Sequence, residues 1–268
     1  MSEFPPAQHV IRDLAMTSQL VSPTRHVGVA DAAMGPGLLA TFVDASAGLV
    51  VLRAARPDWS ATADLELHLA APGIAAGPLV SDVRLVRAGS RLVVVRAAVH
   101  EAAPGSDPDA LLDDLDLAVA GPVVATAVLS FVRMPASRSA AADLFDHDAL
   151  AERRRMDVVP GADVVGRVDA RVDGGVVEID ATPYVRNSMG AVTGGVHALA
   201  IELAAEAAIP GSQVTDLSVH YLAAARVGPM RATATVLRAD ACEVEVVDAD
   251  SGDVVSLGAA VVRPARGG

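Results

Sequence analysis

The 268-residue sequence has a single cysteine, Cys242, and only seven aromatic residues. One thiol cannot form an internal disulfide and leaves no cysteine-based zinc or iron–sulfur site, so we expect neither a metal nor a redox cofactor. No segment reaches the roughly 18 uninterrupted apolar residues that a membrane span requires, and the start of the chain lacks the apolar core of a signal peptide. These absences predict a soluble, cytoplasmic protein without a membrane partner.

Positive charge is also scarce, because 21 basic residues stand against 33 acidic ones and the net charge is −12. An acidic surface repels phosphodiester backbones, which argues against nucleic acid as a partner. Apolar residues make up 52% of the chain. At this length they suffice for one large domain or two ordinary domains with their own cores.

The sequence contains an internal repeat, and a duplicated unit changes the meaning of every motif. Residues 35–44 align with residues 193–202, and the alignment pairs Gly37 with Gly195 at an offset of 158. Both stretches end in an acid. Two copies of one module are the simplest explanation.

Strand-like segments follow each copy and extend the repeat. Residues 64–69 align with residues 216–221 at an offset of 152, so the connecting loops differ by a few residues. His68 and His220 recur at matching positions of these segments, which suggests an architectural role for both.

Each copy shows a helix first and strands afterwards. Residues 37–50 and 195–208 carry Ala, Leu and Val all round the helical circumference, which is typical of a helix buried on most sides. Leu65, Leu67 and Leu69 alternate with polar residues, as in a strand with one apolar face. Antiparallel strands wrapped around a buried helix form an α+β arrangement.

The repeat also predicts the domain boundaries. We expect a first module at 1–135, a linker at 136–160 that contains a charged helix at 140–156, and a second module at 161–268. Residues 101–120 are acidic and rich in turn signals, and they are predicted to be a solvated surface excursion between two strands.

One segment of the second half combines an amide, glycines and an acid at fixed spacing: Asn187, Gly190, Gly194, Gly195 and Glu202. It resembles the Asn-x-x-Gly-x-x-His-Gly-Gly segment and downstream acid of hotdog-fold acyl-CoA thioesterases of the phenylacetate-degradation type. Thr193 stands where the histidine is usual, and Glu202 replaces the commoner aspartate. The resemblance covers both halves and implies a tandem, or double, hotdog, with sites between the two hotdogs and hydrolysis of a CoA thioester.

Physical reasoning assigns roles to the same residues. Gly194 and Gly195 open an apolar helix, where unpaired N–H groups and the macrodipole favour an oxyanion. Such a donor is worth roughly 2.7 to 4 kcal/mol in enzymes. Glu202, about two turns further on, is predicted to activate water or to attack the thioester, and both roles stay open. Thr193, Gly195 and His197 are assigned to substrate binding, although His197 alternatively fills a gap at the module interface.

The resemblance also implies a hydroxyl from the opposing module, two residues before the Asp-apolar start of a strand. Thr62 fits this position because it precedes Asp64 by two residues. In a regular strand, however, Thr62 would share the polar face of Asp64. Its counterpart in the second half is Val214.

The repeat predicts that the other site is degenerate. Subtracting 158 from Asn187, Gly194 and Glu202 gives Val29, Pro36 and Asp44. Proline has no N–H to donate. We therefore expect the site formed by Asp44 and Pro36 to retain only its acid, and the chain to have one working site.

Together these features predict an acyl-CoA thioesterase that forms a homo-oligomer and has coenzyme A only as part of its substrate. A non-catalytic acyl-CoA-binding module stays open as an alternative. A hotdog hydratase or dehydratase is less favoured, because Phe42 stands where the glutamate of the fatty-acid dehydratases is expected after Gly37. Arg153 to Arg155 are assigned to a solvated face of the linker helix, with contact to CoA phosphates as the alternative.

Overall fold

The computed structural model describes residues 9–14, 16–72, 78–135, 154–155, 163–187 and 189–265. The helices and strands of the first half, in chain order, are α1 His9–Asp13, β1 Met16–Ser22, β2 Arg25–Ala30, α2 Pro36–Ala54, β3 Trp59–Leu69, β4 Leu79–Ala88, β5 Leu92–Glu101, α3 Pro108–Asp113, α4 Leu115–Ala118 and β6 Val123–Met134. They are followed by β7 Arg154–Arg155, α5 Val164–Val168, β8 Arg171–Asp173, β9 Val176–Ile179, the 3-10 helix η3 Pro183–Val185, α6 Gly194–Ala208, β10 Ser212–Tyr221, β11 Met230–Arg238, β12 Ala241–Asp248 and β13 Val254–Pro264.

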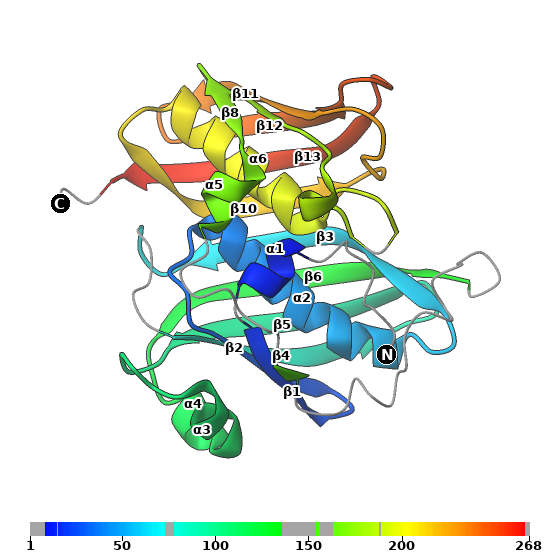
Figure 1. Ribbon diagram of the computed structural model, residues 1–268, viewed down its shortest axis with the longest axis vertical. Coiled ribbons are helices and arrows are strands. Elements are labelled where there is room, and N and C mark those ends of the chain that lie inside the picture. Colours follow the sequence, from blue (N-terminus) through cyan, green and yellow to red (C-terminus); the bar gives the residue numbers. More distant parts are fainter. Residues whose placement is uncertain are drawn as a thin grey trace.

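The strands form one antiparallel sheet in the order β7-β1-β2-β4-β5-β6-β3-β10-β13-β12-β11-β9-β8. Outward from the central β3–β10 pair, β6, β5, β4, β2 and β1 on one side correspond to β13, β12, β11, β9 and β8 on the other. Figure 1 shows α2 (blue) lying across the sheet of one half and α6 (yellow) across that of the other. Each half is a sheet around a central helix, which confirms the α+β double-hotdog fold.

The predicted linker, 136–160, lies outside the described residues except for β7. The helix expected at 140–156 does not extend to Arg154 and Arg155, because these residues pair with Ser18 and Thr17 of β1 as a short strand. The boundaries of the two modules and the linker stay predictions.

The excursion at 101–120 is more than a solvated loop. It contains α3 and α4, and Leu111 and Leu112 of α3 are buried in a small apolar cluster with Val27, Val29 and Val80 of β2 and β4. Figure 1 shows the two helices beside the β2–β4 part of the sheet. Burial of these leucines explains why an acidic, turn-rich segment folds back onto the sheet.

Helix α2 is long and apolar enough to cross a membrane by length and composition alone. In the structure, 61% of its most apolar window is buried inside the protein. Its composition is accounted for by its place in the core, where Phe42, Val43 and Val50 are fully buried.

Helices α2 and α6 pack directly against each other, and two glycines permit the contact. A Cβ at Gly195 would overlap Thr41, and a Cβ at Gly37 would overlap the backbone of Leu199. Both pairs obey the offset of 158, since 195 − 158 = 37 and 199 − 158 = 41. The contact is therefore pseudo-symmetric, and Gly195 belongs to the helix crossing rather than to a substrate-binding surface.

Strand β3 contains a β-bulge that decides where Thr62 points. Thr62 pairs with Phe131 and Asp64 with the adjacent Ser130, so Ala63 is an extra residue in the ladder. One extra residue reverses the alternation of faces, and Thr62 therefore points inward while Asp64 points outward. Strand β10 has the equivalent irregularity between Val214 and Asp216, again 152 residues further on.

The two halves are joined by β3 and β10, whose register is itself pseudo-symmetric. Nδ1 of His220 lies 2.7 Å from Oδ1 of Asp64, and Nδ1 of His68 lies 2.8 Å from Oδ1 of Asp216. Each histidine thus pairs with the aspartate of the other half, which gives both the architectural role expected from the sequence. Because more than a third of each side chain is exposed, these pairs specify register more than they add stability.

The helix crossing makes a testable prediction. Gly195→Ala should lower the free energy of unfolding by about 1 to 3 kcal/mol, because the added methyl group has no room beside Thr41. Gly48→Ala, in α2 but with open space at its Cβ, should leave stability unchanged or raise it by up to about 1 kcal/mol through helix propensity. Urea denaturation of both variants measures the difference, and equal stability of Gly195→Ala and the wild type would contradict the account.

Candidate active site

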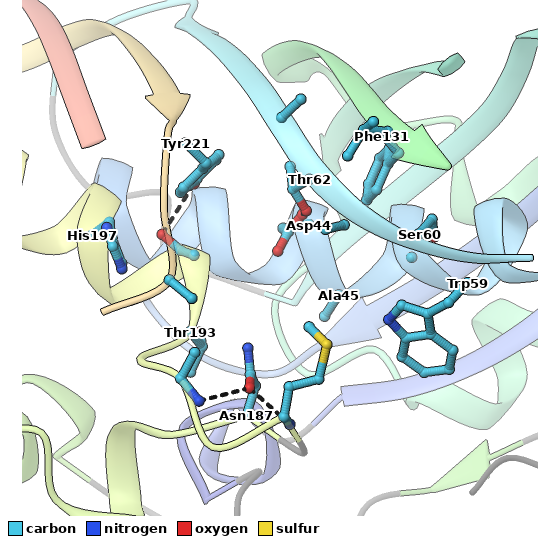
Figure 2. Close-up of a pocket in the computed structure, with 18 of the residues that line it drawn as sticks. Asp44, Ala45, Trp59, Ser60, Thr62, Phe131, Asn187, Thr193, His197 and Tyr221 are labelled. Atoms are coloured by element: carbon cyan, nitrogen blue, oxygen red, sulfur yellow. Dashed lines mark hydrogen bonds between the residues drawn. The ribbon is translucent and has the colours of Figure 1, made fainter. Parts of the chain in front are cut away.

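A cavity of about 550 Å³ lies where the two halves meet. The first half contributes residues from α2, β3 and β6, and the second half contributes the loop before α6, the first turn of α6 and the end of β10. The polar groups at its wall include Asp44, Thr62, Asn187, Thr193, His197 and Tyr221, which Figure 2 labels, and the backbone of Gly194. Thr62, Asn187, Gly194, Thr193 and His197 are thus brought together as the sequence predicted, and they are joined by Asp44.

Asp44, on α2, is the carboxylate of this cavity. The hydroxyl of Thr62 donates a hydrogen bond to Oδ1 of Asp44 at 2.8 Å, and Figure 2 shows the two side chains facing each other. Desolvation raises the pKa of Asp44 to about 6, although the Thr62 hydrogen bond lowers it. A carboxylate with this pKa is ionised at neutral pH and close to the value that suits a general base.

Asn187 presents its amide nitrogen to the cavity. Its side-chain oxygen accepts hydrogen bonds from the backbone N–H groups of Met189, at 2.9 Å, and Ala191, at 3.2 Å. Two N–H donors identify that atom as the oxygen, so the NH₂ group is the end directed away from the loop, toward the side of the cavity where Asp44 lies (Figure 2). The site therefore has a fixed side-chain donor.

The first turn of α6 supplies a backbone donor. Within the part of the chain that the structure describes, the N–H of Gly194 has no hydrogen-bond acceptor, whereas the N–H of Thr193 is bonded to the carbonyl of Val185. A Cβ at Gly194 would approach the ring of Tyr221 to 3.2 Å, so glycine leaves room for that ring against the first turn of α6. A free N–H at a helix N-terminus is suited to an oxyanion.

Tyr221 and His197 hold this turn in place. The hydroxyl of Tyr221 donates to the carbonyl oxygen of Gly194 at 3.0 Å, and its ring packs edge-on against His197 at 5.8 Å. Nδ1 of His197 lies 3.0 Å from Oγ of Ser256, and burial lowers the pKa of His197 to about 4. A neutral histidine bonded to Ser256 supports the first turn of α6, and among the described residues it has no acidic partner.

Glu202 is not part of this cavity, and the prediction that it completes the site with Asn187 and Gly194 is wrong. Glu202 lies eight residues beyond Gly194, which is about 12 Å along the same helix. A side chain cannot span that distance back to its own N-terminus. Because α2 and α6 cross, each acid instead faces the N-terminus of the other helix.

Glu202 lies in a second, pseudo-equivalent arrangement, in which an acid on α6 faces the first turn of α2. Its Oε2 accepts a hydrogen bond from the N–H of Gly37 at 2.7 Å, next to Pro36 in the first turn of α2. Burial and the nearby Glu206 raise the pKa of Glu202 to about 8, against the lowering effect of the Gly37 hydrogen bond. Pro36 therefore belongs with Glu202, and the predicted pairing of Asp44 with Pro36 is also wrong.

Three of the side-chain differences between the two arrangements decide which of them is open. Glu202 corresponds to Asp44 and is one methylene longer, which lets it reach the opposite helix N-terminus. Glu206 corresponds to Gly48, and its Oε1 accepts the N–H of Val214 at 2.9 Å. Val214 corresponds to Thr62. The Asp44 arrangement is open to a ligand, whereas the Glu202 arrangement is filled by its own carboxylates.

The fold has solved counterparts. This chain is a double hotdog. An acyl-ACP thioesterase from Bacteroides thetaiotaomicron superposes with a TM-score of 0.56 at 11% identity, over 88% of this chain and 98% of that one. A 12:0-ACP thioesterase from Umbellularia californica gives 0.57 at 10% identity, over 91% and 99% of the two chains. A tesB protein from Mycobacterium avium subsp. paratuberculosis gives 0.54 at 13% identity, over 95% and 98%.

These likenesses establish the fold and not the activity, because all three identities are low. No protein-family model matches the sequence, and no curated protein matches it. Among the described residues, no group of three or more His, Cys, Asp or Glu side chains could hold a metal ion.

The raised pKa of Glu202 makes a prediction about stability. Between pH 4.5 and about 8 the unfolded chain releases the Glu202 proton and the folded chain keeps it, so rising pH favours unfolding. Glu202→Gln retains an oxygen for the Gly37 N–H and cannot ionise. Over this interval the variant should gain up to about 1.4 kcal/mol of unfolding free energy per pH unit relative to the wild type. Urea denaturation at pH 5, 7 and 9 measures the difference in unfolding free energy between the variant and the wild type. A difference that does not change with pH would contradict the assignment.

Proposed function

We propose that the chain hydrolyses acyl-CoA thioesters at the cavity between its halves. The observation that carries the proposal is the Asp44 carboxylate, bonded to Thr62 and placed in the same cavity as the free N–H of Gly194 and the amide of Asn187. The proposal keeps the resemblance to the phenylacetate-degradation thioesterases but gives the acid role to Asp44, which is also the residue type commoner in that family.

The geometry supports separate roles for the residues of the two halves. The thioester carbonyl oxygen accepts from the Gly194 N–H, where the α6 dipole stabilises the negative charge that develops as the carbon becomes tetrahedral. Asn187 supplies a second donor, and Thr62 orients Asp44. Water adds across the thioester, so the products are a carboxylic acid and the free thiol of CoA.

Two routes for Asp44 fit this arrangement. As a general base it takes a proton from the attacking water and passes it to the departing thiolate. As a nucleophile it attacks the carbonyl carbon and forms a mixed anhydride that water then cleaves. After a single turnover in ¹⁸O-labelled water, label in Asp44 identifies the nucleophilic route with attack of water on the Asp44 carbon of the anhydride. Attack on the acyl carbon leaves no label in Asp44, so trapping of the anhydride with hydroxylamine is the second measurement.

The acyl group has an apolar place to bind beyond Asp44. Gly48, one helical turn after Asp44, leaves open space where Glu206 fills the other arrangement. The wall beyond it is apolar and is formed by Leu49, Leu52, Trp59, Phe131 and Met134. Trp59 and Phe131 place aromatic rings at the site even though the chain as a whole has few (Figure 2).

The alternatives receive less support from the site. A hydratase needs a histidine paired with an acid, but His197 is bonded to Ser256. A purely binding module gives no reason for an ionisable carboxylate beside an open helix N-terminus. Coenzyme A as the carrier, the absence of a cofactor, the homo-oligomer and the cytoplasmic location stay predictions.

Substitution of the two acids tests the proposal. Asp44→Asn keeps the shape of the side chain but removes the proton acceptor or nucleophile, so turnover should fall about a hundredfold or more. Glu202→Gln is the matched control on the pseudo-equivalent helix and should retain turnover within a few-fold. Thiol release from a panel of acyl-CoAs is measured on both variants, with thermal melting to verify folding. Loss of activity in Glu202→Gln but not in a folded Asp44→Asn would overturn the proposal.

The pH dependence follows from the pKa of Asp44. Both routes require the ionised carboxylate, so kcat/KM should rise with pH, with a midpoint near 6, and then level off. Thr62→Val removes the hydrogen bond that lowers this pKa and should move the midpoint upward. Ser60→Ala, a change at another hydroxyl of the cavity wall, should leave it in place. A profile that is flat from pH 5 to pH 8 in the wild type would argue against Asp44.

A further inference from the structure

The mouth of the cavity is formed by the segment after β10. Four of the five exposed residues in the cavity lining, Leu222, Ala223, Ala224 and Arg226, lie in this segment, and the fifth is Val132 of β6. The groups around Asp44 are enclosed or partly enclosed. A ligand with its reacting atoms at Asp44 therefore leaves the protein past this segment.

Asp248 fixes the shape of the mouth. Its buried carboxylate accepts hydrogen bonds from the backbone N–H groups of Arg226, Val227 and Gly228, at 3.0, 2.9 and 2.9 Å. These backbone bonds lower the pKa of Asp248 to about 2. The carboxylate is therefore ionised, and its oxygens are bonded to main-chain N–H groups. The segment that carries Arg226 is thus held rigidly, which reduces the entropy cost of using it for binding.

Two arginine side chains bind main-chain carbonyl groups at this point. Arg186 donates to the carbonyl oxygens of Ala181, Gly190 and Arg226, at 2.7, 2.6 and 3.0 Å. Arg226 donates to the carbonyl oxygen of Met189 at 2.9 Å. In the described part of the chain, neither guanidinium forms an ion pair with a carboxylate. Arg226 keeps four of its five N–H donors available, and Arg186 keeps two.

Arg226 is an exposed cation on a chain whose net charge is −12. Arginine N–H groups bind phosphate oxygens in a planar, often bidentate geometry that few other side chains provide. Arg226 lines the mouth, and Arg186 is bonded to its carbonyl oxygen. This is where a thioester carrier that enters the cavity would still be exposed.

We propose that Arg226, supported by Arg186, forms a phosphate-binding subsite at the mouth of the cavity, which takes the phosphate groups of coenzyme A while the thioester lies at Asp44. This assignment rests on the proposed function. It also replaces the contact between CoA phosphates and Arg153 to Arg155 that was left open as an alternative.

The two arginines also connect the loop of Asn187 to the loop of Arg226, so a purely structural role must be distinguished from phosphate binding. A structural role affects every substrate alike. Phosphate binding affects only substrates that carry phosphate. The comparison therefore uses one acyl group on three carriers: CoA, 4′-phosphopantetheine and pantetheine.

Arg226→Ala should raise KM for the acyl-CoA about tenfold, with little change in kcat, and should leave KM for the acyl-pantetheine unchanged. The 4′-phosphopantetheine substrate shows which phosphate is bound: a rise in KM with it assigns the subsite to the phosphate that CoA shares with carrier proteins, and no rise assigns it to the rest of the nucleotide. Arg226→Lys should recover part of the loss. Arg238→Ala, which removes the same charge away from the cavity, should behave as the wild type.

An equal rise in KM for the acyl-CoA and the acyl-pantetheine, or no rise for the acyl-CoA, would overturn the subsite. Calorimetric titration with free CoA and free pantetheine makes the same comparison without turnover. If the wild type hydrolyses none of the three substrates but binds CoA more tightly than Arg226→Ala does, the proposed function fails and the phosphate subsite stands.

Discussion

The close crossing of α2 and α6 is the constraint on which the rest of the structure depends. Gly37 and Gly195 let the two helices approach until a single methyl group would not fit. At that separation, a side chain two turns along one helix faces the first turn of the other. Asp44 and Glu202 consequently each face the N-terminus of the other helix and not that of their own. Both arrangements are therefore shared between the two halves.

Small differences between the two copies then decide which arrangement can bind a ligand. Glutamate at 202 is long enough to bond the N–H of Gly37, and with Glu206 it fills its half with carboxylates. The shorter side chain of Asp44 leaves the first turn of α6 free, and Gly48 adds no side chain, so a cavity stays open beside Gly194. The bulge at Ala63 turns Thr62 toward Asp44, whereas the equivalent bulge in β10 presents an apolar Val214. One duplicated frame thus contains an open arrangement and a closed one.

The fold could be predicted from the sequence because the repeat, the apolar helices and the alternating strands are local patterns. Several polar residues of the cavity could be predicted as well, since Asn187, Gly194 and Thr62 stand at recognisable spacings. The choice between Asp44 and Glu202 could not, because it depends on how two helices cross, and no spacing within one helix reports that. Tyr221 was missed as the residue that fixes the first turn of α6. Gly48, a glycine one turn after an acid in an Ala-rich helix, was an available signal of open space.

The most direct test of the cross-helix pairing is a crystal structure with an acyl-CoA analogue in which a methylene group replaces the thioester sulfur, since this ligand keeps the carbonyl and cannot be hydrolysed. The account predicts that the carbonyl oxygen lies within hydrogen-bond distance of the Gly194 N–H, with Asp44 beside the carbonyl carbon and Glu202 still bonded to Gly37. A carbonyl bound at Gly37, with Glu202 displaced toward it, would contradict the account.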